Sequence, residues 1–258
     1  MKLTQIRNAT LKVDYAGATF LIDPMLAEKE AWAGFAGTAR SWLRNPLVSL
    51  PLSLEELLDV DAVIVTHTHP DHWDDAAQRH IPKAMPIYTQ NAQDAALIRS
   101  QGFSQVHVLT QENTLAGITL WKTGGQHGSD ALYANPDLAA RMGETSGLVF
   151  DSAKEKRLYI AGDTVWAPPY VDSLQRYQPE VVVLNIGCAT VDGFGPIIMG
   201  KEDASRTLEL LPHSMVVASH MEAVNHCLLS RAELREYCRE NGIEQRVLIP
   251  DDGEMLSL

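Results

Sequence analysis

The sequence has little cysteine, with only 3 among its 258 residues, at Cys188, Cys227 and Cys238. Their number is odd and no two form a CxxC pair, which excludes a disulfide framework and a cysteine-rich zinc site. The chain also lacks an uninterrupted apolar segment of signal-peptide or membrane-spanning length. We therefore expect three reduced thiols in a cytoplasmic protein that has no membrane partner.

Positive charge is also scarce. The chain has 21 Lys and Arg residues against 33 Asp and Glu residues, a formal net charge of −12. A field of this sign repels a polyphosphate backbone, and no stripe of Lys or Arg interrupts it, so nucleic acid is not expected as a partner. A small anion is still compatible, because a bound dication reverses the potential inside a cleft. We expect a small-molecule substrate and leave a homo-oligomer open.

Linkers and low-complexity segments are absent as well. The content of 45% hydrophobic and 21% charged residues is that of an ordinary globular protein. Layered α/β folds of this length often form one unit around a continuous core region. The sequence therefore predicts a single domain that spans residues 1–258.

Two apolar hairpins divide the sequence into similar halves. They are expected over residues 11–22 and 147–161, and they end at Asp23 and Asp163. Strands and helices alternate after each hairpin, from a buried strand at 62–65 to a last strand at 247–249. This order indicates an α/β (α+β) fold with an internal duplication and a site between the halves.

The segment 25–50 has weak periodicity and carries Arg40, Trp42 and Arg44. Long irregular segments in compact domains are usually functional loops, so this segment is predicted to form a pocket wall that helps to select the substrate. After it, Ser53 and Glu56 have the spacing of a capping box and predict the start of a short helix.

Four residues with ligand-type side chains lie within six positions, directly after the strand at 62–65. They are His67, His69, Asp71 and His72. His67 and His69 are two residues apart at a strand end, so their rings project to the same side, and the other two can converge from the turn. Imidazole and carboxylate ligands suit zinc and also tolerate manganese or iron. The segment therefore predicts a metal site.

Further ligands are expected at other strand ends, because a catalytic metal site needs side chains that converge from several segments. His127 follows a strand-like segment inside a glycine-rich stretch, while Asp163 and His220 each follow an apolar strand. His226 is an alternative to His220 as the last ligand, or a substrate contact. Thr66, Thr68 and Asp23 are expected to support the ligands by hydrogen bonds.

The order of these motifs resembles the metallo-β-lactamase superfamily over essentially the whole chain. The shared motifs are HxHxDH, then Gly-Gly-Gln-His-Gly, then Ala-Gly-Asp-Thr, then a late Ser-His. Within it, Asp23-Pro24, Gly-Asp-Thr and the stretch 195–204 are similar to the branch that contains L-ascorbate-6-phosphate lactonase. The resemblance implies a four-layer αββα sandwich of two similar halves, with the metals at one edge of the sheets.

The resemblance also implies roles for the ligand residues. His67, His69 and His127 would hold one divalent ion, while Asp71, His72 and His220 would hold a second. Asp163 would bridge the two ions. Asp71 would also act in catalysis, by accepting a hydrogen bond from the attacking water and carrying its proton.

The expected function is hydrolysis of a small ester, lactone or phosphate-containing compound by a metal-activated water. Two zinc ions are the first expectation, with manganese or iron as alternatives. A non-heme iron oxidoreductase of the dioxygenase kind is the second hypothesis, because such enzymes have related ligand sets on the same fold. A metal-stabilised binding protein without turnover is the third.

Overall fold

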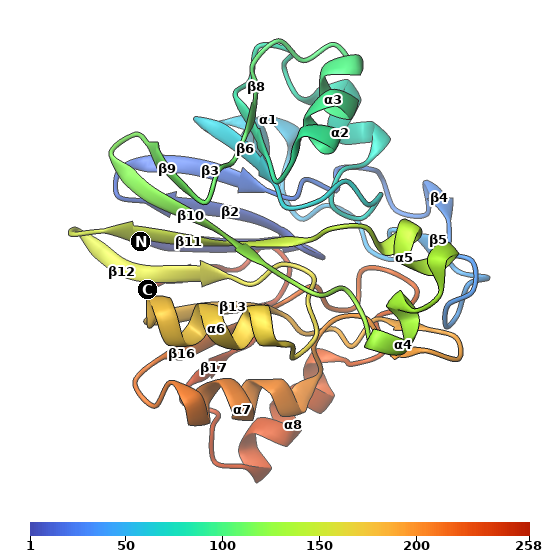
Figure 1. Ribbon diagram of the computed structural model, residues 1–258, viewed down its shortest axis with the longest axis vertical. Helices are drawn as coiled ribbons and strands as arrows, with labels where there is room; N and C mark the ends of the chain where they lie inside the picture. The colour runs from blue at the N-terminus through green and yellow to red at the C-terminus, as the bar shows by residue number, and fades with distance from the viewer.

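Two hairpins organise the structure, a computed structural model that describes residues 1–258 (Figure 1). In the first, β2 (Thr10–Tyr15) pairs with β3 (Ala18–Ile22), and the tight turn places Ala16 and Gly17 at positive φ angles of 51° and 92°. In the second, β11 (Ser146–Ser152) pairs with β12 (Glu155–Ile160). Both hairpins predicted from the sequence are confirmed.

The first hairpin belongs to a seven-stranded sheet with the strand order β18-β1-β2-β3-β6-β7-β8. Its pairs are antiparallel from β18 to β3 and parallel from β3 to β8. The remaining strands are β1 (Lys2–Arg7), β6 (Ala62–Val65), β7 (Ile87–Thr89), β8 (Val106–Val108) and β18 (Met255–Ser257).

The second hairpin belongs to another seven-stranded sheet, with the order β17-β16-β13-β12-β11-β10-β9. Its pairs are antiparallel from β9 to β12 and parallel from β12 to β17. The two sheets thus repeat one pattern, as the predicted duplication requires. The remaining strands are β9 (Glu112–Leu115), β10 (Ile118–Gly124), β13 (Val181–Asn185), β16 (Met215–Ser219) and β17 (Val247–Leu248).

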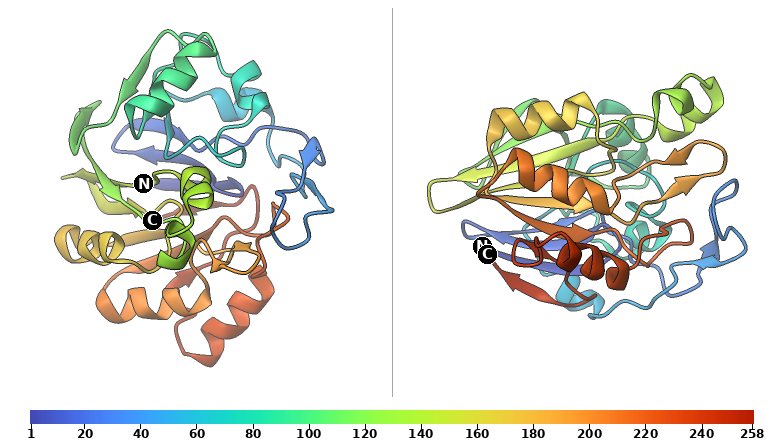
Figure 2. Two further views of the ribbon diagram at one scale, coloured as in Figure 1. Left: turned by 45° about the vertical axis from the view of Figure 1, so that its right-hand side comes forward. Right: turned by 90° about the horizontal axis from the view of Figure 1, so that it is seen from below.

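The sheets pack face to face and helices cover their outer faces, which gives the predicted αββα layers (Figures 1 and 2). Between the sheets, Phe150 packs against Tyr15 and Phe20 with ring centroids 5.6 and 5.5 Å apart. Each such buried side chain stabilises the fold by about 1.5–3 kcal/mol. The helices outside the first sheet are α1 (Leu54–Leu58), α2 (Asp75–His80) and α3 (Ala92–Ser100), and those outside the second are α6 (Pro168–Tyr177), α7 (Lys201–Leu210) and α8 (Arg231–Glu240).

Helix starts follow the capping signals in the sequence. Ser53 before α1 and Ser230 before α8 each accept a hydrogen bond from the residue three positions later and complete a capping box with Glu56 or Glu233. No helix combines the length and the apolar character that a membrane crossing would need.

The C-terminal end of the chain differs from the prediction. The strand at 247–248 is not the last one, because β18 follows and pairs with β1, so that the two termini lie side by side (Figure 2). Neither β1 nor β18 has a strong apolar alternation of its own that would predict a strand.

The segment 25–50 is mostly irregular, as predicted, with only the short pair β4 (Trp32–Ala33) and β5 (Arg44–Asn45). In Figure 1 it lies at the right-hand end of the sandwich, together with α4 (Asp130–Tyr133) and α5 (Pro136–Met142). The ends of β3 and β12 point toward this side.

Candidate metal centre

The structure brings all seven predicted ligand residues together at the end of the sandwich where the strands β6, β10, β12 and β16 end. Their ligand atoms form three overlapping groups, each with atoms within 4.8 Å of one another. All of them except His69, which is partly exposed, are buried. The members are His67, His69, Asp71, His72, His127, Asp163 and His220.

The first group consists of His67, His69 and His127. His69 donates from Nε2 to the carbonyl of Arg141 at 2.9 Å, and His127 donates from Nδ1 to the carbonyl of Ile197 at 2.9 Å. A carbonyl can only accept, so the hydrogen of each ring lies on the outer nitrogen. The inner nitrogens, His69 Nδ1 and His127 Nε2, therefore present lone pairs to the centre of the group.

His67 is oriented in the same way through Thr66. The Thr66 hydroxyl donates to Asp23 Oδ2 at 2.7 Å, and its oxygen lies 3.1 Å from His67 Nδ1, from which it accepts. The inner His67 Nε2 then faces His69 Nδ1 at 3.0 Å. Two lone pairs at this distance with no hydrogen between them repel each other, and a cation between them removes the repulsion. The geometry fits a metal ion.

The second group consists of Asp71, His72 and His220. His220 Nε2 lies 3.2 Å and His72 Nε2 3.9 Å from Asp71 Oδ2. The outer nitrogens again have partners, since His72 Nδ1 lies 2.8 Å from Asp23 Oδ2 and His220 Nδ1 lies 3.3 Å from the sulfur of Cys227. Ligands held by such outer contacts are typical of metal centres.

Asp163 lies between the two groups. Its Oδ2 is 3.1 Å from His72 Nε2, 3.6 Å from His127 Nε2 and 3.7 Å from His220 Nε2. Its other oxygen, Oδ1, accepts a hydrogen bond from Asn185 at 2.7 Å. The carboxylate thus has one oxygen fixed by the protein and one directed at both groups.

The pKa values of the histidines in the cluster are shifted in opposite directions. Burial lowers the pKa of His72, but Asp163, Asp23 and Asp71 outweigh burial and raise it to about 10. Burial raises the pKa of Asp163, but His72 and His220 hold it well below its usual range. Burial also lowers the pKa of His127 to about 4. Such opposed shifts in one buried cluster are typical of functional sites.

Of the three supporting residues predicted from the sequence, two contact the cluster through their side chains. Asp23 also accepts from the backbone N–H of Thr66 at 2.7 Å, which fixes the start of the histidine segment. The Thr68 hydroxyl instead donates to Asp94, in the first turn of α3, at 2.9 Å, so its predicted support of the ligands is wrong.

Sequence reasoning missed three contacts of the ligands. Asn8 donates from Nδ2 to Asp71 Oδ2 at 3.3 Å, Asn185 holds Asp163, and Cys227 lies against His220. Asn185 is the last residue of the apolar strand β13 and pairs with Ser219, the residue before His220, so its place at a strand end was the available signal. Asn8 follows a strand that the sequence did not predict.

A cavity of ≈ 240 Å³ opens beside the cluster and includes His69, Asp71, His127 and Asp163 in its wall. His226 also lines it, which places that residue beside the cluster but outside all three ligand groups. The remaining lining residues are Phe35, Thr38, Pro70, Arg141, Met142, Val191 and Ile197.

The segment 25–50 contributes Phe35 and Thr38 to this wall, but the residues expected to select substrate lie elsewhere. Arg40 donates to the carbonyls of Asn225 and Cys227, and Arg44 donates to the carbonyls of Glu30 and Ala31. Both arginines therefore hold the backbone and do not line the cavity. The prediction that this segment forms a pocket wall is confirmed, but Phe35 and Thr38 form it, and not Arg40 or Arg44.

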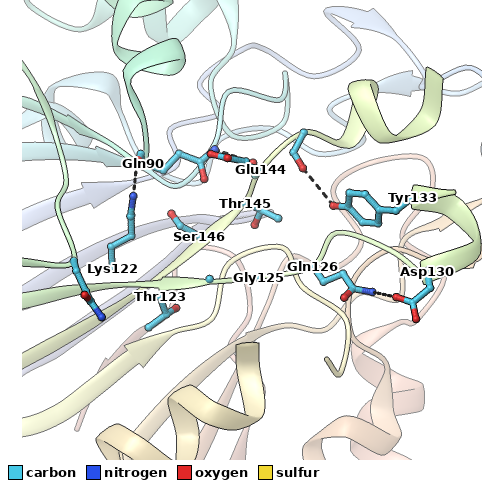
Figure 3. A pocket seen from close by; sticks show the side chains of 13 residues that line it. Gln90, Lys122, Thr123, Gly125, Gln126, Asp130, Tyr133, Glu144, Thr145 and Ser146 are labelled. Atoms are coloured by element: carbon cyan, nitrogen blue, oxygen red, sulfur yellow. Dashed lines mark hydrogen bonds between the residues drawn. The ribbon is translucent and has the colours of Figure 1, made fainter. Parts of the chain in front are cut away.

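A larger cavity of ≈ 750 Å³ is lined by 13 residues, of which 1 is hydrophobic (Figure 3). In it, Gln126 donates to Asp130 at 3.0 Å, and Lys122 donates to the carbonyl of Gln90 at 2.6 Å. None of the seven cluster residues lines it. A third cavity of ≈ 690 Å³ includes His67 and His69 of the cluster, whereas the cavity of ≈ 240 Å³ includes four cluster residues and reaches both outer ligand groups and Asp163.

Comparison with known proteins gives a family and close relatives. The model of the Beta-lactamase superfamily domain matches residues 18–221. The chain is 48% identical to the UPF0173 protein YddR of Bacillus subtilis (strain 168) over 98% of each chain.

Two solved structures are similar over the full length. One is an isothiocyanate hydrolase from Delia radicum gut bacteria, with 64% identity and a TM-score of 0.99 over 100% of this chain and 99% of that one. The other is described as a possible metal-dependent hydrolase from Veillonella parvula DSM 2008, with 46% identity and a TM-score of 0.98 at the same coverage.

Proposed function

Because the chain belongs to the Beta-lactamase superfamily and to the UPF0173 family of metal-dependent hydrolases, we propose that it hydrolyses small organic isothiocyanates. In this reaction one isothiocyanate and one water give one primary amine and one carbonyl sulfide. The electrophilic carbon lies between nitrogen and sulfur and carries no formal charge. The proposed substrate is therefore small and neutral.

The observation that carries this proposal is the cavity beside the histidine–aspartate cluster. Its volume of ≈ 240 Å³ is below the range of about 300–1,000 Å³ that is usual for drug-sized ligands. Phe35, Met142, Val191 and Ile197 make much of its wall apolar, and Arg141 is its only Lys or Arg. A compact apolar substituent fits such a wall. The similarity to the isothiocyanate hydrolase over the whole chain supports the same substrate class.

An ester, lactone or phosphate compound is the other substrate class suggested by the sequence motifs. A phosphorylated lactone carries two negative charges, which a binding site normally meets with several cations or backbone N–H groups. Arg141 alone is a weak match for such a group. We therefore rank this class, and the resemblance to L-ascorbate-6-phosphate lactonase, below the isothiocyanates.

The cluster would hold two divalent ions. His67, His69 and His127 would bind one, Asp71, His72 and His220 the other, and Asp163 would reach both. Nitrogen and oxygen ligands without a thiolate favour zinc and also accept manganese or iron. A divalent ion in this place would supply an acidified water as the nucleophile and stabilise the negative charge that develops on the substrate.

Asp71 is the proposed catalytic residue of the chain. Burial raises its pKa, but the effect of His72 and His220 is larger and lowers the pKa well below its usual range. The carboxylate is therefore ionised. An ionised carboxylate only accepts hydrogen bonds, and this one lines the cavity. It can therefore orient the attacking water and carry its proton toward the nitrogen of the substrate.

The test is a hydrolysis assay with benzyl isothiocyanate that measures the amine and carbonyl sulfide in equal amounts. Asp71→Asn is expected to lower kcat/KM by about 10²–10⁴-fold, the usual contribution of an acid–base group. Asp75→Asn, an exposed carboxylate on α2, serves as the matched control and is expected to keep full activity. Oxygen consumption in place of carbonyl sulfide release would favour the oxidoreductase hypothesis and overturn the proposal.

A further inference from the structure

His226 lines the active-site cavity but belongs to none of the three ligand groups. Its side chain is only 5% exposed, and its Nδ1 is buried without a hydrogen-bond partner. Buried polar atoms in folded proteins nearly always have a partner, so a histidine that leaves one of its ring nitrogens buried and unpaired needs an explanation other than packing. Since Nδ1 faces the protein, Nε2 is the nitrogen that the ring can offer to the cavity.

The backbone that carries His226 is held by the neighbouring residue, Asn225. Asn225 Oδ1 accepts from the backbone N–H of Phe35 at 3.0 Å and from Asn45 Nδ2 at 2.8 Å, while its Nδ2 donates to Thr38 Oγ1 at 3.0 Å. These bonds tie the backbone beside His226 to the wall contributed by the segment 25–50. The backbone beside the ring therefore has a set position before any ligand arrives.

Phe35 completes the setting. Its ring meets His226 edge to face, with centroids 4.7 Å apart and an interplanar angle of 75°. Another apolar side chain would pack against Phe35 equally well and would leave no polar atom buried without a partner. An imidazole at this position therefore has a purpose other than packing, and the cavity is where it can act.

We propose that His226 donates a hydrogen bond from Nε2 to the substrate atom that receives an electron pair when water attacks the isothiocyanate carbon; this inference rests on the proposed function. In that step a C–O bond forms and the electron pair of the C=N bond moves to nitrogen. Nitrogen takes one proton of the attacking water. When the C–N bond then breaks, nitrogen takes the second proton and leaves as the amine, and carbonyl sulfide remains. His226 itself neither gains nor loses a proton in these reaction steps.

The tautomer agrees with this role. With the hydrogen on Nε2, the ring offers a donor to the cavity and buries only a lone pair at Nδ1. With the hydrogen on Nδ1, an N–H group would be buried unpaired, which costs the full loss of its hydration. A donor aimed at a site where charge develops is worth more in a buried cavity than in water.

A pair of variants separates this role from packing. His226→Gln keeps an N–H donor, whereas His226→Phe fills the space beside Phe35 but cannot donate. Steady-state kinetics with benzyl isothiocyanate, metal content by elemental analysis and thermal denaturation are measured for both variants and the wild type. We expect His226→Phe to lower kcat by about 10²–10³-fold, with unchanged metal content, as for other donors to a developing charge. His226→Gln is expected to recover at least tenfold of that loss.

Four results would overturn the inference. If the phenylalanine variant is as active as the glutamine variant or more so, the residue only packs. If either variant loses metal, His226 supports the metal centre instead of the substrate. If the wild-type protein with its metal bound releases no amine, the proposed function fails and this inference fails with it, whereas activity that is insensitive to both substitutions rejects the inference alone.

Discussion

Asp23 is a single residue that fixes both parts of the histidine segment. One carboxylate oxygen accepts from the backbone N–H of Thr66, and the other lies at 2.7 Å from the Thr66 hydroxyl and 2.8 Å from His72 Nδ1. Through Thr66 it also sets the ring of His67. The residue stands at a positive φ of 46° directly after β3, a conformation that Asp tolerates better than most residues. Asp23 therefore positions one residue of each proposed ligand group.

Replacing Asp23 with Asn tests this positioning role. An amide has only one acceptor oxygen, and its N–H₂ group would face the hydrogen of either Thr66 or His72. We expect zinc affinity to fall by about 10–100-fold, as is usual when an outer partner of a metal-binding histidine is lost. Competition with a chelating dye measures the affinity. Asp75→Asn is again the control, and an unchanged affinity for the Asp23 variant would show that the ligands hold their orientation without it.

At the scale of elements, one side chain of β1 anchors the segment 25–50. Arg7 is fully buried and donates to the carbonyls of Met25, Ala27 and Val48 at 2.6, 2.8 and 2.9 Å. Burial lowers its pKa to about 10, with Asp74 and Asp252 acting in the opposite direction, so it is still a cation at neutral pH. The irregular segment that forms the cavity wall thus has its two ends fixed to the first sheet.

Arg7→Met is expected to destabilise the protein by about 3–5 kcal/mol, because it leaves buried carbonyl groups without donors and removes a buried charge from its partners. The free energy of unfolding in urea measures this effect. KM is expected to rise as well, since Phe35 and Thr38 belong to the segment that is released. Arg7→Lys keeps the charge but not the forked geometry, so an intermediate loss is expected. If Arg7→Met lowers the free energy of unfolding by less than about 1 kcal/mol, the segment 25–50 is held mainly by its other contacts.

At the scale of the whole molecule, the proposed metal centre joins the two halves of the sandwich. His67, His69, Asp71 and His72 follow a strand of the first sheet, whereas His127, Asp163 and His220 follow strands of the second. A bound ion therefore links the two sheets at one end. Binding to the folded state alone stabilises that state by mass action.

Metal removal is expected to lower the melting temperature. A free metal concentration about 1,000 times Kd contributes about 4 kcal/mol, and a chain of this size shifts by about 2–4 °C per kcal/mol, which together give a loss of about 8–16 °C. Differential scanning calorimetry before and after chelation measures the shift, and added zinc is expected to reverse it. The double variant with His67→Ala and His220→Ala, which removes one residue from each proposed ligand group, should not respond to the chelator. An equal response in that variant would place the metal elsewhere.

Local patterns in the sequence were enough for many of the elements and for the ligand types, but not for helices such as α6 or for strands such as β9. The hairpins, the strand at 62–65, the capping boxes at Ser53 and Ser230 and the histidine motif each depend on residues that are neighbours in the chain. The resemblance of the motif order then gave the superfamily and the layered fold. Strand β18 was missed because its partner β1 lies more than 240 positions away in the chain, and no local signal carries that pairing. Strand β1 also pairs with its neighbour β2, but its many polar residues gave no apolar alternation to predict it.

Only the tertiary structure decided how these residues act on one another. The sequence left His220 and His226 as alternatives six residues apart, and the fold directs His220 into the cluster and His226 into the cavity. The fold also determines the hydrogen-bond partners of Asn8, Asn185 and Arg7. It directs the side chains of Arg40 and Arg44 to backbone carbonyls and not into the cavity. The physical reason is that residue type and spacing determine which atoms are available for bonding, whereas the direction of a side chain depends on the packing of distant segments around it.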